Sequence, residues 1–268
     1  MWKFITAGVI ALAIVVGGFS LIDVSGGTVT ASAAIAAPQT SIDGFTRAES
    51  PLDWQFPRNY GAHPEYQTEW WYYTGNVKTD DGRHFGYQFT VFRRAIASQN
   101  ITTDSEWRTN QIYMAHFTVS DIEAQRFYHE KRYSRAGAGL AGALPNNSTP
   151  DAAYHVFLED WVVKASDDSH TVYTIQAASP KGFAVDMTLT QVKPPALQGD
   201  NGLSAKSADA GNASHYYTLS RLVTAGTITI GDETFPVNGY TWKDHEFSTS
   251  ALGSTALGWD WFGLQFDD

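Results

Sequence analysis

The pattern of apolar and polar positions divides the chain into two unlike parts. Residues 4–22 contain no charged side chain, lie between Lys3 and Asp23, and are followed by Ala31-Ser32-Ala33. A positive charge, an apolar run and small residues before a cleavage point are the layout of a secretory signal. We expect a cleaved signal peptide over residues 1–37, with a retained membrane anchor as the alternative. The protein is then exported, to the periplasm or the medium, or is membrane-anchored if the signal is uncleaved.

From residue 59 onward, runs rich in aromatic and β-branched residues predict strands. Residues 38–58 are polar and contain prolines, so they predict an irregular N-terminal segment, while residues 136–153 and 194–214 predict long loops. No stretch past the signal keeps the period of an amphipathic helix, so the fold class is all-β, an antiparallel β-barrel or sandwich. The predicted strands are 69–78, 83–94, 111–120, 154–164, 171–177, 183–193, 215–223, 227–230 and 233–242.

The strongest strand signal is a hairpin around Thr79-Asp80-Asp81-Gly82. With Asp81-Gly82 as the central turn residues, the partners across it would be Glu69 and Arg94, Trp71 and Phe92, Tyr73 and Thr90, and Gly75 and Gln88. Glu69, Trp71, Tyr73, Gln88 and Arg94 would then share one mixed face, opposite a core face of Trp70, Tyr72, Phe85, Tyr87, Phe89 and Val91. The mixed face is either a ligand pocket inside a barrel or a solvent-facing surface with an ordinary Glu–Arg pair.

Composition narrows the function classes. The chain of 268 residues has no cysteine, so disulfides, cysteine nucleophiles and thiolate metal sites are excluded. Acidic side chains outnumber basic ones, 28 to 18, and basic residues do not cluster, so nucleic acid is not an expected partner. Aromatic residues make up 14% of the chain, which favours an apolar ligand cavity.

The densest titratable cluster is Asp244-His245-Glu246, which follows Lys243. On an extended strand Asp244 and Glu246 would share one face, and Lys243 and His245 the other, so the four can converge only if the strand ends or bulges there. We take His245, Asp244 and Glu246 as candidate catalytic residues, together with Asp260, which lies between two tryptophans where an apolar setting would raise its pKa. The candidate ligand-binding residues are Glu69, Trp71, Tyr73, Gln88, Arg94, His116, Trp242, Trp259 and Trp261.

No metal site is expected. Three consecutive residues cannot all ligate one ion, and no His-x-His or His-Glu-x-x-His spacing occurs. A zinc site would have to recruit His63, His84 or His116 from a distance. A serine hydrolase is equally unsupported, because no Gly-x-Ser-x-Gly motif is present.

Six segments of the chain form a recognisable set: Tyr60 to Asn76, Gln88 to Arg93, Ala115-His116-Phe117, Arg126 to Arg135, Trp242 to Phe247 and Asp260-Trp261. Together they resemble the CrtC/AttH family of two-domain lipocalin-like proteins, which includes carotenoid 1,2-hydratase (hydroxyneurosporene synthase) and exported proteins described as predicted secreted hydrolases. The resemblance covers roughly residues 51–268. It implies a lipocalin-like barrel over residues 59–235. Residues 236–268 would begin a second such domain that is truncated here, since the last residues resemble a strand that stops in an Asp-Asp turn.

In the hydratase branch, water is added to an isoprenoid double bond by protonation of the alkene, without a cofactor. The resemblance gives His245 the acid–base role and the tryptophans the shielding of a cation. Phe247 stands where the hydratases have tryptophan, which is closer to the AttH-like secreted branch. The expected function is hydration or hydrolysis of an apolar isoprenoid or lipid-like substrate. The alternative is a non-catalytic hydrophobic-ligand carrier, associated with the envelope membrane or an ABC exporter.

Overall fold

A computed structural model describes residues 42–99, 104–250 and 260–266. These residues belong to one compact unit, 38–268. The expected signal peptide, residues 1–37, lies outside the described residues. In the described part of the chain, no helix is both long and apolar enough to cross a membrane.

The described residues form an almost entirely β structure with two short 3-10 helices. The helices are η1 (Arg58–Tyr60) and η2 (Gly137–Gly139). The strands are β1 (Thr68–Lys78), β2 (His84–Ala95), β3 (Gln111–Asp121), β4 (Arg126–Arg135), β5 (Ala141–Leu144), β6 (His155–Leu158), β7 (Trp161–Ala165), β8 (Val172–Ser179), β9 (Phe183–Gln191), β10 (Ala196–Leu197), β11 (Leu203–Ala205), β12 (Ala213–Ile230) and β13 (Glu233–Ser248).

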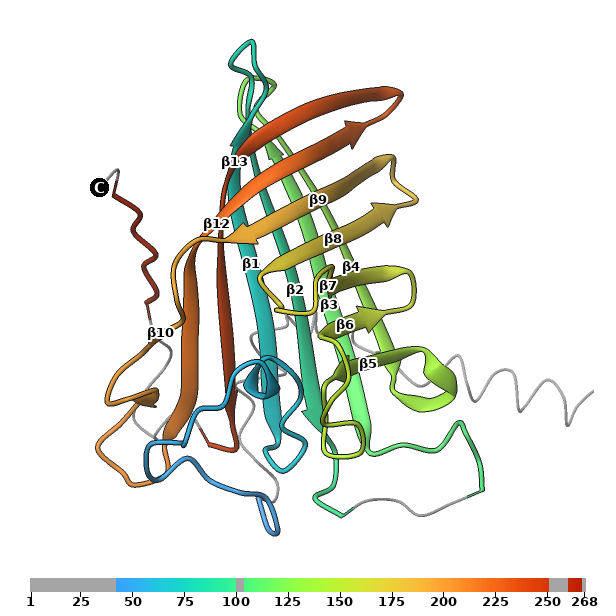
Figure 1. Ribbon diagram of the computed structural model, residues 1–268. Coiled ribbons are helices and arrows are strands. Elements are labelled where there is room, and N and C mark those ends of the chain that lie inside the picture. Colours follow the sequence, from blue (N-terminus) through green and yellow to red (C-terminus); the bar gives the residue numbers. More distant parts are fainter. Residues whose placement is uncertain (1–41, 100–103, 251–259, 267–268) are drawn as a thin grey trace, which may run out of the picture. The chain divides into compact units, whose positions relative to one another are not determined.

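The strands pair into one antiparallel sheet that curls into a nearly closed barrel (Figure 1). Their order is β4-β3-β2-β1-β13-β12-β9-β8-β7-β6-β5, with β10 and β11 paired to β12. Phe89 of β2 and Phe117 of β3 contact the Trp161 ring of β7 across the interior, with ring centroids 6.5 and 5.6 Å apart. At the edge, Arg132 of β4 donates to the Ala178 carbonyl of β8. The all-β, lipocalin-like antiparallel barrel expected from the sequence is therefore confirmed.

Two long strands carry the curvature. β12 contains both predicted strands 215–223 and 227–230 as one strand, with a shift in pairing between Leu219 and Leu222. Such a bulge bends a strand, and in Figure 1 β12 and β13 turn from the direction of β1 toward that of β9. β13 extends past the predicted end at residue 242 and pairs with both β1 and β12 up to residues 247–248. The expected domain boundary at residue 235 thus falls inside a strand of this sheet.

Other departures from the predicted strands are local. Residues 154–164 were expected as one strand but form β6 and part of β7, because Glu159 takes a left-handed φ of 58° and turns the chain. β4, which the alternation pattern did not predict, is an edge strand whose side chains are mostly exposed. Such a strand has little apolar alternation to detect.

The first hairpin has a register one residue away from the predicted one. Thr79 and Arg83 close the turn, because the Thr79 amide donates to the Arg83 carbonyl at 3.0 Å and the Gly82 amide donates to the Thr79 carbonyl. The loop therefore consists of Asp80, Asp81 and Gly82, with Gly82 in the left-handed region at φ 96°. Glu69 consequently faces Arg93 and not Arg94, and Trp71, Tyr73 and Gly75 face Val91, Phe89 and Tyr87 instead of Phe92, Thr90 and Gln88.

This correction moves half of the predicted mixed face to the other side of the sheet. A shift of one residue exchanges the two faces of a strand. Glu69, Trp71 and Tyr73 remain inside the barrel and are fully buried. Arg94 and Gln88 lie on the opposite face of the sheet, together with Trp70 and Tyr72. Trp70 and Tyr72 were predicted to be core residues, but they are only partly buried and lie outside the barrel interior. The interior face is completed by Phe85, Tyr87, Phe89 and Val91, all buried.

The irregular segment before β1 covers part of the interior. Trp54 and Phe56 pack against the Tyr217 ring of β12 with centroids 5.6 and 5.1 Å apart, and Tyr60 lies 5.7 Å from the same ring. His63 stacks on Phe247 of β13 at 3.7 Å. The aromatic side chains of residues 54–63, which we call the covering segment, thus lie against the inner faces of β12 and β13.

The close packing of this interior can be tested at Gly75. A Cβ at Gly75 would lie 2.2 Å from Cε1 of the buried Tyr87 ring, so Gly75→Ala forces the ring to move and should cost about 1–3 kcal/mol of unfolding free energy. Gly86, in the other strand of the hairpin, has its nearest neighbour at 3.7 Å, so Gly86→Ala should cost less than about 1 kcal/mol. Urea denaturation measures both. Equal losses would contradict the packing described here.

Candidate functional site

The Lys243-Asp244-His245-Glu246 cluster is divided between the two faces of β13. Each of the four pairs in regular register with β1, so no bulge brings them together. Lys243 and His245 point into the barrel and are fully buried, whereas Asp244 and Glu246 lie on the opposite face. Asp244 and Glu246 therefore do not flank His245 as a catalytic pair.

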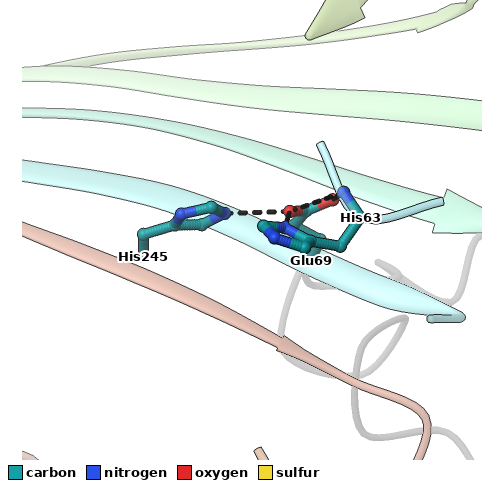
Figure 2. Close-up of side chains that lie close together, drawn as sticks. All are labelled: His63, Glu69 and His245. Atoms are coloured by element: carbon teal, nitrogen blue, oxygen red, sulfur yellow. Dashed lines mark hydrogen bonds and ion pairs between the residues drawn. The ribbon is translucent and has the colours of Figure 1, made fainter. Parts of the chain in front are cut away.

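The carboxylate that His245 contacts is Glu69 of β1. Oε1 of Glu69 lies 2.9 Å from Nε2 of His245 and 2.9 Å from Nδ1 of His63, so one oxygen bridges two imidazoles (Figure 2). The His63 backbone amide also donates to this carboxylate, at 3.0 Å to Oε2. Glu69 is fully buried and joins the covering segment, β1 and β13.

Arg93 of β2 neutralises Glu69. Its Nε donates to Glu69 Oε2 at 2.8 Å, and Nη2 donates to the carbonyls of His63 and Tyr66 at 2.9 and 2.8 Å. Nη1 donates to Oε1 of Gln111 at 2.7 Å. A buried charge pair is stable only when its remaining donors are satisfied, and here they are.

The hydrogen-bond pattern assigns the protons of both imidazoles. Oδ1 of Asn59 accepts the Gln55 amide proton, so Nδ2 of Asn59 faces Nε2 of His63, at 3.0 Å. An amide nitrogen only donates, so Nε2 of His63 accepts and its proton lies on Nδ1, toward Glu69. On the other side, the ionised Glu69 carboxylate only accepts, so Nε2 of His245 carries the single proton of the neutral ring. Nδ1 of His245 therefore accepts from the Tyr217 hydroxyl, 3.1 Å away, and that hydroxyl accepts from Nζ of Lys243 at 3.0 Å.

This assignment bears on metal binding. Nδ1 of His63, Oε1 of Glu69 and Nε2 of His245 lie within 4.8 Å of one another, a set that could hold a metal ion. A ligating imidazole nitrogen must present a lone pair, but both nitrogens here donate protons to Glu69. The guanidinium of Arg93 adds positive charge at the same carboxylate. The described residues fit a hydrogen-bonded network better than a metal centre.

Lys243 lies at the end of this network, in a cage of tyrosines. The described residues place five tyrosine rings around its Nζ, at 4.6–5.8 Å from their centroids: Tyr60, Tyr73, Tyr154, Tyr173 and Tyr217. Within the described residues, no carboxylate lies within ion-pair distance of Nζ. The hydroxyls of Tyr73 and Tyr154 are hydrogen-bonded to each other at 2.7 Å. The cage is therefore apolar in its walls and carries hydroxyl groups within them.

Burial sets the protonation of these groups. Burial lowers the pKa of His245 to about 3, although the hydrogen bond to Glu69 opposes this, so the ring is neutral at pH 7. Burial also lowers the pKa of Lys243 well below its ordinary value. For Glu69, burial raises the pKa, but the charge of Arg93 and the two imidazole hydrogen bonds outweigh it and hold the pKa well below the usual range. The site at pH 7 thus contains an ionised carboxylate, a neutral imidazole and an amine with a weakened preference for its charged form.

The opposite face of β13 holds a separate polar cluster. Asp244 accepts hydrogen bonds from the Tyr216 hydroxyl at 2.8 Å and the Thr218 hydroxyl at 2.6 Å. Burial raises the pKa of Asp244 to about 6, although these two hydrogen bonds oppose it. Glu246 forms an ion pair with Lys206 at 2.7 Å. These carboxylates are held by neighbours on β12 and in the preceding loop.

The remaining predicted site residues that the structure describes lie away from the barrel interior. Asp260 is exposed and not in the apolar setting that was expected. Trp261 donates from Nε1 to the Tyr216 hydroxyl at 3.2 Å and packs against Trp242, both on the side of β13 that carries Asp244. His116 is on the outward face of β3 beside Phe92. Trp259 lies outside the described residues.

Several residues of the network were not predicted from the sequence. Arg93 and Tyr217 were not singled out, and the inward position of Lys243 was not used. The predicted alternation would have placed Lys243 beside His245, so a buried His245 implied a buried lysine. The contact between Tyr217 and His245 could not be predicted in this way. The two residues are far apart in sequence, and only the pairing of β12 with β13 brings them together.

Comparison with known proteins places the chain in a family. The model of the AttH-like family matches residues 47–268, so the chain belongs to that family. A comparison with curated protein sequences found no match.

Two solved structures share this architecture. A putative AttH from Nitrosomonas europaea is 30% identical, with a TM-score of 0.63 over 76% of this chain and 60% of that one. Kievitone hydratase from Nectria haematococca is 11% identical, with a TM-score of 0.51 over 78% of this chain and 56% of that one, and shows the fold alone. The chain thus spans a little over half the length of the structures it matches.

The Glu69–Arg93 pair should dominate the stability of the site. Arg93→Met leaves Glu69 buried without its counter-charge and should cost about 3–5 kcal/mol of unfolding free energy. Arg94→Met, next along β2 but on the half-buried opposite face, should cost less than about 1 kcal/mol. Urea denaturation at pH 7 distinguishes the two. A larger loss for Arg94→Met would mean that the hairpin has the other register.

The raised pKa of Asp244 predicts a pH-dependent effect. Because the folded pKa, about 6, exceeds the ordinary 3.8, the folded protein binds more protons between these values, and stability falls as pH rises through this window. Asp244→Asn removes this loss, so the variant should gain roughly 2–3 kcal/mol relative to the wild type between pH 4 and pH 7. Denaturation curves over this range measure the difference. Glu246→Gln, which loses the ion pair with Lys206, should show no such gain at high pH, and a flat Asp244→Asn difference would contradict the assignment.

Proposed function

We propose that this protein is an acid–base enzyme that adds water to, or hydrolyses, an apolar substrate inside the barrel. The observation that carries the proposal is the buried chain of hydrogen bonds from Lys243 through Tyr217 and His245 to Glu69. Such a chain can move a proton without exposing a charge to water. Membership of the AttH-like family and the fold shared with kievitone hydratase support the same reaction class.

The roles follow from which atoms are occupied. Both ring nitrogens of His245 are hydrogen-bonded, one to Glu69 and one to Tyr217, so the ring exchanges protons with substrate only through the Tyr217 hydroxyl. Tyr217 is then the catalytic residue, donating a proton to the substrate or taking one from it. His245 is a positioning residue that relays the proton, and Glu69 stabilises the imidazolium as it forms.

The interior favours an apolar substrate. Trp71 stacks on the His245 ring at 4.9 Å, and Tyr73, Tyr154 and Tyr173 line the same region. Apolar walls with a few converging polar groups are typical of sites for small hydrophobic molecules. An isoprenoid or lipid-like compound fits this chemistry. The signal-like N-terminus adds the proposal that the enzyme acts after export.

Turnover in labelled water tests the proposal. The purified chain is incubated with a panel of isoprenoid alkenes, enones and lipid esters in H₂¹⁸O, and the products are analysed by mass spectrometry. We expect incorporation of label into one product class, and a loss of about 10²-fold or more in Tyr217→Phe and His245→Gln. His129→Gln, on the exposed face of β4, is the matched histidine control and should retain full activity.

Two results would contradict the proposed function. If panel compounds quench tryptophan fluorescence by binding but the wild type never incorporates label, the protein is a carrier. If His245→Gln and Tyr217→Phe turn substrate over as fast as the wild type, the chemistry lies elsewhere.

A further inference from the structure

Lys243 is a fully buried amine with few polar partners among the described residues. Its ammonium group would have to be removed from water, yet the described residues supply only one hydrogen bond to it, from Nζ to the Tyr217 hydroxyl. Burying an amine in this way is costly and is seldom retained without a function. Lys206, by contrast, is placed beside the Glu246 carboxylate on the other face.

The surroundings of Nζ suit a neutral amine. The titratable groups that face it are the phenols of Tyr60, Tyr73, Tyr154, Tyr173 and Tyr217, with His245 and Glu69 beyond Tyr217. The phenols stay protonated at pH 7, since burial raises the pKa of each. The ring faces offer some attraction to a cation, but burial lowers the pKa of the lysine well below its usual value. An unprotonated amine in an apolar pocket is a nucleophile.

We propose that Lys243 is an imine-forming lysine that captures an apolar aldehyde or ketone inside the barrel. Nζ attacks the carbonyl carbon, and the carbonyl oxygen takes a proton from the Tyr217 hydroxyl. Of the two protons that Nζ gives up, one restores Tyr217, with Nδ1 of His245 able to hold it in passing, and the other completes the water molecule that leaves as the carbinolamine becomes the imine. The step needs no oxidant or co-reactant, and hydrolysis of the imine restores the free lysine.

This inference names a substrate class for the proposed function and rests on it for the proton relay. A carbonyl conjugated to a carbon–carbon double bond would connect the two. The protonated imine draws electrons from the double bond, water adds to the far carbon, and the adjacent carbon takes a proton from Tyr217. The proton that the added water loses restores Tyr217. Hydrolysis of the imine then releases a β-hydroxy carbonyl compound, so the net change is the addition of one water molecule.

The substrate must pass the covering segment to reach Lys243. The amine is fully buried, and Trp54, Phe56 and Tyr60 lie over the Tyr217 ring beside it. Entry therefore requires these aromatic side chains to move. A flexible apolar chain is better suited to this route than a rigid polar compound.

Reductive trapping tests the proposal without knowledge of the natural substrate. The folded chain is treated at pH 7 with hexanal and cyanoborohydride, digested, and mapped by mass spectrometry. We expect an adduct at Lys243 that forms at least about ten-fold faster than the mean rate at the exposed Lys78, Lys131 and Lys164, because only about one in 10³ of an ordinary lysine is neutral at this pH. A parallel reaction with formaldehyde, a small polar carbonyl, tests access.

Variants separate the alternatives. Lys243→Met should fold, lose the interior adduct and leave surface labelling unchanged. Tyr217→Phe should retain the amine but form the adduct several-fold more slowly. His245→Gln should still be labelled at Lys243 even where it loses hydration.

Other results would exclude the imine, the apolar carbonyl class or the proposed function. Adducts on exposed lysines only, or at Lys243 no faster than there, exclude an imine-forming role. Labelling of Lys243 by formaldehyde but not by hexanal excludes the apolar carbonyl class. Undiminished hydration by Lys243→Met overturns the imine while leaving the proposed function intact, whereas a hexanal adduct without any turnover on the panel leaves the lysine assignment intact and removes the proposed function.

Discussion

The buried carboxylate of Glu69 is the interaction on which the rest of the site depends. It receives hydrogen bonds from His63 in the covering segment, from Arg93 on β2 and from His245 on β13, while it is itself part of β1. His63 lies six residues before Glu69, whereas Arg93 and His245 are 24 and 176 residues away from it in sequence. An ionised carboxylate cannot remain buried unless its partners are in place, so each element is held to the others by the same charge.

The alternation of β13 gives its two faces different chemistry. Inside the barrel, Lys243 and His245 meet aromatic rings and one bridging carboxylate, whereas on the other face Asp244 and Glu246 are bound by hydroxyls and a lysine. The same four-residue stretch therefore contributes to a buried chain of hydrogen bonds on one side and to a polar cluster on the other. Both faces of this strand therefore carry buried ionisable side chains.

The polar groups of the interior suit some charges on a bound molecule better than others. Tyrosine hydroxyls, Lys243 and Arg93 can all donate, and the carboxylate that contacts this network, Glu69, is already neutralised. An electron-rich oxygen that develops in a reaction would be stabilised by such groups, and a neutral apolar chain would be accommodated by the rings. This balance supports the proposed carbonyl substrate over a permanently charged ligand.

Much of the architecture was determined by the sequence itself. Period-two alternation and turn residues identified most strands, the all-β class and the opposed faces of β13, because the direction of a side chain along a strand is a local property. The hairpin register was missed because it depends on whether the turn uses two or three residues, and only the hydrogen bonds of Thr79 show that it uses three.

The partners of His245 were decided by tertiary structure alone. Sequence proximity pointed to Asp244 and Glu246, but neighbours along a strand face opposite ways, and the groups that reach His245 come from β1 and β12 through strand pairing. Local pattern can place a residue on a face. Which distant residue shares that face depends on the order and register of the strands, and these are set by the packing of the whole sheet.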